Sequence, residues 1–357
     1  MDRWELEGMT NKNLGAEIAS AATRDAAWPG ASSPIRFASS GQAADLDVII
    51  VNYNTGHLLE QCIGSLRLAS AGLSVQVVIV DNASRDDSLS VIRQRLPDCT
   101  LIANTQNVGF GRANNQALAV CHAPYVLLLN TDAFVSTDTL ARSLAYMREK
   151  QRIGVLGVSL HDEHGHGVNA GRVFPSPWHT FLLQTGLFKS LLQEEDAVLA
   201  AREKPGAREC DWVVGCYYLI RRSVIDQIGL FDPRYFLYFE EVDHCRAVWR
   251  AGWTIECLTT TGVIHIGGAS AKSEGELNVG RQIPELQIES GLLYYRKHDG
   301  LTGVLLSAGL SFLTDLILVV KHLLKRRPLA GLGVFARHTA AVGRLLIQTR
   351  LGTRPTR

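Results

Sequence analysis

The sequence predicts an α/β fold in which a doubly wound, mostly parallel sheet is flanked by helices and followed by a helical C-terminal region. Short apolar runs bounded by turn residues recur between positions 46 and 129, as buried strands do. The segments between these runs carry apolar residues at helical spacing, for example Leu58, Leu59, Cys62, Ile63 and Leu66. Strands that alternate with helices are typical of a parallel sheet covered on its faces.

The first half of the chain predicts its elements in a regular order. Strands are expected at 46–51, 75–80, 101–102 and 125–129. Helices are expected over 58–66, 84–95, 112–121 and 137–150. Ser84 and Asp87 resemble a capping box for the second of these helices.

After Ile153 the pattern changes. Residues 153–160 and 168–173 flank a turn at 161–166 that is rich in His, Gly and Asp, which predicts a hairpin. The turn lacks metal-ligand spacing, so we expect it to be solvated rather than a zinc site. The later elements expected are a helix at 178–204, an extended segment at 212–220 and a helix over 240–251.

Composition limits the class of protein. The length of 357 residues and the apolar fraction of 46% allow one large domain plus an appendage. The net charge of +1 gives no case for nucleic-acid binding. Seven scattered cysteines without CxxC spacing indicate a reduced, cytoplasmic compartment. No secretory signal is visible, and we expect the aperiodic residues 1–44 to be disordered.

The C-terminal region is apolar and then basic. Residues 301–324 are strongly apolar except for Asp315, after which the chain has no acidic residue. Lys321, Lys325 and Arg326 follow, and a basic segment beside an apolar helix favours an anionic membrane surface. The other interpretation is a helical pair that folds back onto the main domain or onto a partner subunit in a homo-oligomer.

Polar side chains follow two of the predicted strands. Asn130, Thr131 and Asp132 come directly after the strand expected at 125–129, and Asp81 comes directly after the strand expected at 75–80. Open α/β sheets bind their ligands at the carboxyl ends of their strands. Asp132 is a hard oxygen ligand suited to a divalent cation on a diphosphate, and Asp81 can accept a hydrogen bond from a nucleobase. Turn or helix-cap roles are the alternative for both carboxylates.

A Gly-containing loop runs from Asn107 to Asn114. Gly109 and Gly111 allow close backbone approach, and the helix that follows favours phosphate at its N-terminus. The spacing is not that of a dinucleotide fingerprint, and a plain loop-to-helix junction is the alternative.

A carboxylate cluster and a histidine follow in the second half of the chain. Glu240, Glu241 and Asp243 come after an aromatic run, and crowded carboxylates raise one another's pKa, which suits a general base. An acidic helix N-terminus is the alternative, above all for Asp243. His265 lies in an extended apolar segment, either as a core histidine or as a metal ligand that complements Asp132.

In this order, the motifs resemble the inverting family 2 glycosyltransferases, specifically their bacterial rhamnosyltransferase-like branch. The matching stretches are VIIVNYN (48–54), VIVDNAS (78–84), NVGFGRANN (107–115), LLLNTDAF (127–134), WVVGCYYLIRR (212–222), GLFDPRYFLYFEEVDHCRAVWRAGW (229–253) and VIHIGG (263–268). The resemblance implies a GT-A fold, in which a Rossmann-like nucleotide half is fused to an acceptor half. We therefore expect a disordered segment at 1–44, a GT-A domain at 45–270 and a helical, basic, membrane-associating region at 271–357.

The resemblance also implies roles for single residues. Asp81 becomes a base-recognition residue, Asp132 and His265 become metal ligands, and Glu241 becomes the general base. The further nucleotide-sugar contacts are Asn52, Asn54, Asn107, Gly109, Phe110, Gly111, Asn114 and Thr131. Asn130 replaces the first Asp of the family's DXD motif, so one carboxylate carries more of the metal binding. Glu241 stands where the family usually has Asp, which keeps Glu240 as an alternative base.

The activity implied is hexosyl transfer with inversion and with Mg²⁺ or Mn²⁺. The donor implied is dTDP-L-rhamnose or, alternatively, a UDP-sugar, and the acceptor is a lipid-linked or cell-surface glycan. The enzyme is expected at the inner face of the cytoplasmic membrane. One rival is an inactive nucleotide-sugar-binding protein, against which the intact Asp132, Glu241 and His265 argue. A second rival is a nucleotidyltransferase, which would need a basic residue in a Gly-rich loop after the first strand. In this chain that position is occupied by residues 52–56, which include no lysine or arginine.

Overall fold

The computed structural model describes residues 37–39, 43–168, 170–187, 198–267, 285–326, 328 and 332–357. Most of the segment expected to be disordered at 1–44 lies outside these residues, as does part of the helix expected at 178–204.

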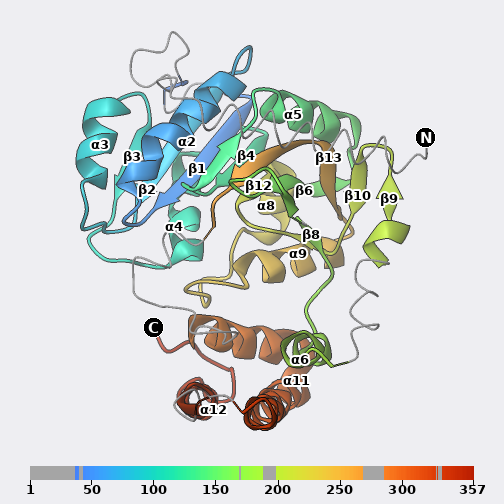
Figure 1. The fold of residues 1–357 in the computed structure, drawn as a ribbon. Coiled ribbons are helices and arrows are strands. Elements are labelled where there is room, and N and C mark those ends of the chain that lie inside the picture. The colour runs from blue at the N-terminus through green and yellow to red at the C-terminus, as the bar shows by residue number, and fades with distance from the viewer. Residues whose placement is uncertain are drawn as a thin grey trace.

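One mixed sheet organises the chain as far as residue 265 (Figure 1). Its parallel part has the order β3-β2-β1-β4, made of β1 (Leu46–Asn52), β2 (Val75–Asp81), β3 (Thr100–Ala103) and β4 (Tyr125–Leu129). Next to β4 the sheet continues with β12 (Tyr217–Arg221), β6 (Ile153–His161) and β13 (Thr254–His265). Strand β12 is antiparallel to both its neighbours, whereas β13 is parallel to β6.

Short strands complete the sheet and its edge. They are β5 (Ala133–Val135), β7 (Gly167–Val168), β8 (Gly171–Arg172), β9 (Glu203–Lys204), β10 (Ala207–Glu209) and β11 (Trp212–Val213). Strand β5 pairs with β13, β7 closes the predicted hairpin with β6, and β8 pairs with β11.

Helices cover the sheet and form the C-terminal region. They are α2 (Gly56–Ala69), α3 (Ser88–Arg95), α4 (Phe110–Ala117), the 3₁₀ turn η1 (Leu118–Val120), α5 (Thr139–Glu149), α6 (Pro177–Thr185), α8 (Arg222–Ile228), α9 (Glu240–Arg250), α11 (Glu285–Leu324) and α12 (Gly333–Gln348). Helix α4 packs on β1 and β2, and α9 packs on β6 and β13. All residues of β2 and β4 are buried, which is why these strands read as continuous apolar runs. The predicted α/β fold of GT-A type is confirmed.

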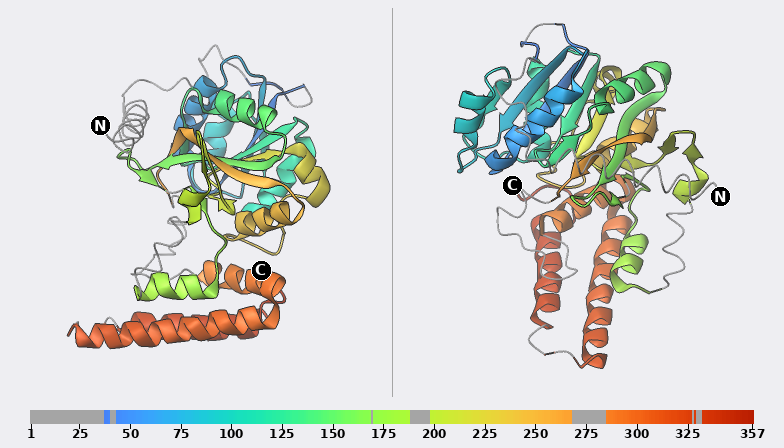
Figure 2. Two further views of the ribbon diagram at one scale, coloured as in Figure 1. Left: turned by 90° about the vertical axis from the view of Figure 1, so that its right-hand side faces the viewer. Right: turned by 45° about the horizontal axis from the view of Figure 1, so that its top comes forward.

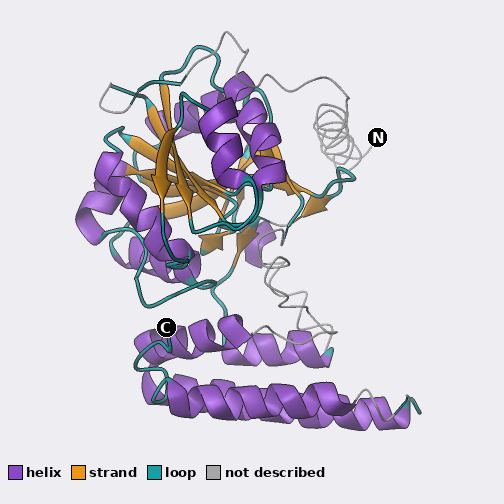
Figure 3. Cartoon of the chain, turned by 90° about the vertical axis from the view of Figure 1, so that its left-hand side faces the viewer, coloured by secondary structure: helices purple, strands orange, loops and turns teal. Residues whose placement is uncertain are grey.

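The C-terminal helices form a separate layer below the sheet (Figures 2 and 3). Helix α11 has two parts, because Gly300 has a non-helical backbone at φ 70° and ψ −157°. The first part packs against α9 through a cluster that includes Tyr235, Val242 and Leu293. The second part lies beside α12, and α6 packs on α11.

Asp315 joins the two long helices. Its carboxylate is buried, lies 2.8 Å from Nδ1 of His338 on α12 and accepts a 2.6 Å hydrogen bond from Thr339. The acidic residue that interrupts the apolar run is therefore an internal contact between α11 and α12. Helix α11 is still long and apolar enough, by length and composition, to cross a membrane.

Three local predictions were wrong. Helix α3 begins at Ser88, and the hydroxyl of Ser84 instead accepts hydrogen bonds from Asn52 and Asn54 in the preceding loop. The helix expected at 178–204 is only partly observed: α6 ends at Thr185, residues 198–201 are helical, and Glu203–Lys204 form β9. The extended segment at 212–220 is broken between β11 and β12, where residues 214–216 turn toward the site.

Candidate active site

A cavity of about 270 Å³ opens at the carboxyl ends of β1, β2 and β4. Its lining from these strand ends and the adjoining loop is Val51, Tyr53, Asn82, Asn107, Gly109, Phe110, Asn130, Thr131 and Asp132. The facing wall is Val214, Gly215, Cys216, Phe236, Leu237, Tyr238, Glu240, Glu241, His265 and Leu286. We call this space the donor cavity.

Asp132 and His265 lie next to each other in the lining of the donor cavity. Strand β5 follows Asp132 directly and pairs with the end of β13, so Ala133 lies opposite His265. His265 Nε2 is 3.3 Å from Asp132 Oδ1. Burial lowers the pKa of His265, but hydrogen bonds to Asp132 and Cys216 outweigh it and raise that pKa to about 10.

These two side chains fit a divalent cation that also binds substrate. Among the described residues there is no group of three His, Cys, Asp or Glu that would hold a metal alone. Mg²⁺ is commonly held by one or two carboxylates together with substrate phosphates and water, so a closed protein cage is not required. Bound metal would need the neutral imidazole of His265 and would release its proton.

A buried polar network supports the strand ends from behind. The hydroxyl of Thr131 lies 2.9 Å from that of Thr55, which donates to Asn52. Asn52 in turn donates to Asp81, whose other carboxylate oxygen accepts from the backbone N–H of Ser84. Asn52 and Asp81 are both fully buried, so in this structure they fix the loops around the donor cavity.

The glycine loop is held against the aromatic segment that precedes α9. Asn82 bonds to Asn107 and accepts from the N–H of Val108. Gly109 has φ 89°, and a Cβ there would lie 2.6 Å from the carbonyl oxygen of Phe236. This position needs glycine both for its left-handed backbone and for the close approach.

Glu240 and Glu241 begin α9 at the other side of the donor cavity. The two residues before them, Tyr238 and Phe239, have φ of 71° and 68°, a strained conformation that is common at functional sites. In each glutamate, Oε2 is buried and has no hydrogen-bond partner in the described part of the chain. Burial and the Glu241 charge hold the pKa of Glu240 well above the usual range, and burial raises the pKa of Glu241 to about 7.

Asp243 differs from Glu240 and Glu241 because its carboxylate is bound by other side chains. It is buried and accepts hydrogen bonds from Lys297 at 2.7 Å, with His298 Nε2 at the same distance. This ion-pair cluster connects α9 to the first part of α11. The Asp243 carboxylate therefore has a structural role.

The structure brings together most of the predicted site residues. Asn107, Gly109, Phe110, Thr131, Asp132, Glu240, Glu241 and His265 line the donor cavity. Asn52, Asn54, Asp81, Gly111 and Asn114 do not line it. The resemblance places Gly215 and Cys216 in an acceptor-side segment, and both line the cavity; sequence reasoning gave no role to Tyr53, Asn82, Phe236 and Tyr238. Asn82 follows Asp81 at a strand end, and Tyr238 lies two residues before Glu240. Their positions next to predicted site residues are the sequence signal that could have identified them.

Comparisons with known proteins agree with this geometry. The family model described as glycosyl transferase family 2 matches residues 47–199. The chain is 30% identical over 235 residues to the N-acetylglucosaminyl-diphospho-decaprenol L-rhamnosyltransferase of Mycobacterium tuberculosis, which covers 62% of this chain and 75% of that protein. It is 27% identical over 172 residues to the rhamnosyltransferase WbbL of Escherichia coli, covering 44% of this chain and 60% of WbbL.

Among solved structures, the mannosyltransferase PcManGT of Pyrobaculum calidifontis, in complex with GDP-Man and Mn²⁺, is similar with a TM-score of 0.49 and 13% identity over 97% of each chain. A TM-score below 0.5 supports no conclusion about this chain. The family is shown instead by the 30% identity to the mycobacterial enzyme over 75% of that protein. The chain is a glycosyltransferase and belongs to glycosyltransferase family 2.

Proposed function

We propose that this glycosyltransferase moves L-rhamnose from dTDP-L-rhamnose to a lipid-linked N-acetylglucosaminyl diphosphate, with inversion at the anomeric carbon. The observation that carries the chemistry is that one cavity is lined both by the Asp132–His265 pair and by the ionisable Glu241. The rhamnosyl donor and the lipid acceptor are proposed from the name of the mycobacterial relative. A UDP-sugar is the alternative donor.

Glu241 is the proposed base. In the transfer its carboxylate accepts the proton of the acceptor hydroxyl, and that oxygen forms a bond to the anomeric carbon. The bond from this carbon to the diphosphate oxygen breaks, and the nucleoside diphosphate leaves with the bonding electron pair. Attack from the face opposite the leaving group inverts the configuration.

Asp132 and His265 would hold a divalent cation against the donor diphosphate. When bound, Mg²⁺ or Mn²⁺ would supply neutralising charge for the leaving group. The backbone of the loop at 107–111 and the side chains of Asn82 and Thr131 would position the nucleotide.

We further propose that the C-terminal helices rest on a membrane. Exposed apolar residues repeat along the second part of α11, namely Leu305, Leu306, Phe312, Leu313, Leu316, Val320, Leu323 and Leu324. Lys325 and Arg326 are exposed at the end of this helix and suit anionic headgroups, whereas Lys321 donates a 2.6 Å hydrogen bond to the carbonyl oxygen of Thr185. Binding of the full chain to anionic vesicles should weaken in Leu306→Glu and at high salt, and a chain that ignores such vesicles at low salt would argue for packing alone.

A thermal-shift panel of nucleotide sugars with Mn²⁺ tests the donor. Selective binding raises the melting temperature by mass action, and dTDP-L-rhamnose should give the largest rise. A larger rise with a UDP-sugar would replace the proposed donor, and no rise with any nucleotide sugar would contradict the proposed site.

A further inference from the structure

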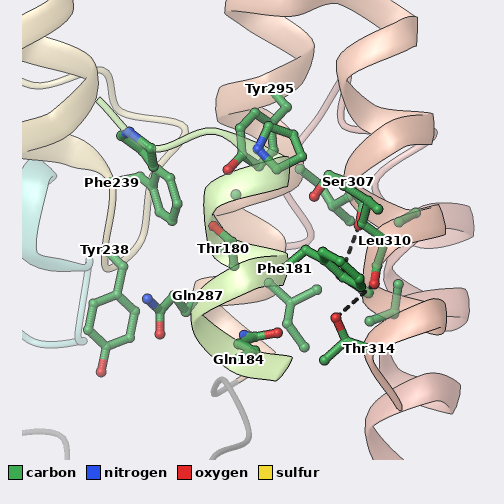
Figure 4. A pocket seen from close by; sticks show the side chains of 18 of the residues that line it. Thr180, Phe181, Gln184, Tyr238, Phe239, Gln287, Tyr295, Ser307, Leu310 and Thr314 are labelled. Atoms are coloured by element: carbon green, nitrogen blue, oxygen red, sulfur yellow. Dashed lines mark hydrogen bonds between the residues drawn. The ribbon is translucent and has the colours of Figure 1, made fainter. Parts of the chain in front are cut away.

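A second cavity of about 230 Å³ shares Glu241 with the donor cavity. It lies between α6, the start of α9 and the helices α11 and α12 (Figure 4). Tyr238 and Glu241 line both cavities. The proposed base therefore lines both spaces, so an acceptor in the second cavity and a donor in the first would lie against the same residue.

The lining of the second cavity is mostly apolar and rich in aromatic residues, and its ionisable residues are Glu241 and His338. Its aromatic residues are Phe181, Trp212, Tyr238, Phe239 and Tyr295. Gln184 and Gln287 lie on the same cavity from α6 and α11, with Thr180 between them and Tyr295 (Figure 4). No lysine or arginine is among the lining residues, so the cavity lacks the cations that a diphosphate would need.

The side-chain amides of Gln184 and Gln287 can still donate and accept hydrogen bonds. Both side chains are half-buried, and neither makes a hydrogen bond to another described residue. An amide offers two donors and an acceptor. Aromatic faces and neutral amides together match a sugar ring, which has an apolar C–H face and a rim of hydroxyls.

We propose that the second cavity is the acceptor subsite and that it binds the uncharged glycosyl unit of the acceptor, with the hydroxyl to be glycosylated directed at Glu241. This inference rests on the proposed function. It makes α6, α11 and α12 part of the substrate site, in addition to any attachment to a membrane. The acceptor's diphosphate and lipid lie outside this cavity.

The test uses the full chain with dTDP-L-rhamnose, Mn²⁺ and an N-acetylglucosaminyl diphosphate ester of a short prenyl alcohol. Gln287→Ala should raise the acceptor KM by roughly two- to tenfold, the worth of one hydrogen bond, and should change the donor KM much less. Gln348→Ala is the matched control, because this glutamine is exposed on α12 away from both cavities. Equal acceptor KM values in the two variants would overturn the subsite and leave the proposed function standing.

A filling variant gives a second measurement. A Cβ at Gly291 would lie 3.6 Å from Phe239, an ordinary contact, and glycine is a poor helix former. Gly291→Leu should therefore keep α11 folded, fill the cavity and raise the acceptor KM more than Gln287→Ala does.

Two competitors separate the sugar from the lipid. Methyl N-acetylglucosaminide should lose binding in Gly291→Leu, whereas a prenyl diphosphate without sugar should not. The reverse result would assign the cavity to the lipid and overturn the proposal. Binding of the glycoside is followed by ligand-observed NMR, so the subsite is tested even if the chosen donor gives no transfer, a result that would count against the proposed function alone.

Discussion

Replacing Glu241 by Gln removes the proposed base with little change of shape. We expect kcat to fall by roughly 10²–10⁴, the usual contribution of a positioned general base. Donor binding should survive, because Asp132 and His265, the proposed metal ligands, are unchanged. Steady-state transfer assays and calorimetric titration with the donor measure the two effects separately.

The pH profile follows from the ionisation of the same residue. Burial raises the pKa of Glu241 to about 7, and only the ionised form accepts a proton. Transfer should therefore lose about tenfold per pH unit below pH 7, and Glu241→Gln should lack this dependence. The groups that face the carboxylate are Glu240, Tyr218 and Cys245.

Protonation of Glu241 also stabilises the fold at low pH. Its folded pKa lies above the ordinary value of 4.5, so the folded chain binds the proton more tightly than the unfolded chain does. The resulting stabilisation is present in full below pH 4.5 and is lost as the pH rises through about 7.

Glu240→Gln is the matched control. Burial and the Glu241 charge hold the pKa of Glu240 well above its usual range and so favour its neutral form, which Gln should replace with only a small loss of transfer. An inactive Glu240→Gln together with an active Glu241→Gln would refute the assignment and move the base by one residue.

Three further changes test other parts of the site and fold. Asp132→Ala should abolish Mn²⁺-dependent nucleotide binding in calorimetry, and full activity of the unaltered enzyme in EDTA would exclude the metal. Gly109→Ala should raise the donor KM and cost about 1–3 kcal/mol of stability, because the loop must leave its left-handed conformation; an unchanged melting temperature would show that the loop adapts. His338→Ala should cost about 1–3 kcal/mol, because the buried Asp315 carboxylate then keeps only Thr339 as a partner; an unchanged midpoint in chemical denaturation would contradict this.

The parallel half of the sheet was predictable because its strands are buried on both faces. Such strands are continuously apolar, as in β2 and β4, and the polar residues that follow them mark the carboxyl edge. Asp132 was identified in this way, whereas Glu241 was identified from the carboxylate cluster that follows an aromatic run. Their convergence on one cavity was implied by the family resemblance, because β4 and α9 lie far apart in the sequence.

Other features depend on tertiary contacts that no local pattern encodes. The hydroxyl of Ser84 is used by the facing loop, so the capping box that its spacing predicted does not form. Asp315 breaks an apolar pattern in the sequence, yet its partner His338 lies on the next helix. The second cavity requires α6 to pack on α11, and no local signal specifies that packing.

The most direct test of the account is the anomeric configuration of the product. The purified chain is incubated with dTDP-L-rhamnose, Mn²⁺ and the short-chain N-acetylglucosaminyl diphosphate acceptor, and the glycolipid is analysed by NMR. A rhamnosyl product whose configuration is opposite to that of the donor, with release of dTDP, is the result predicted for attack assisted by Glu241. Retention of configuration, or release of dTMP in place of dTDP, would contradict the account.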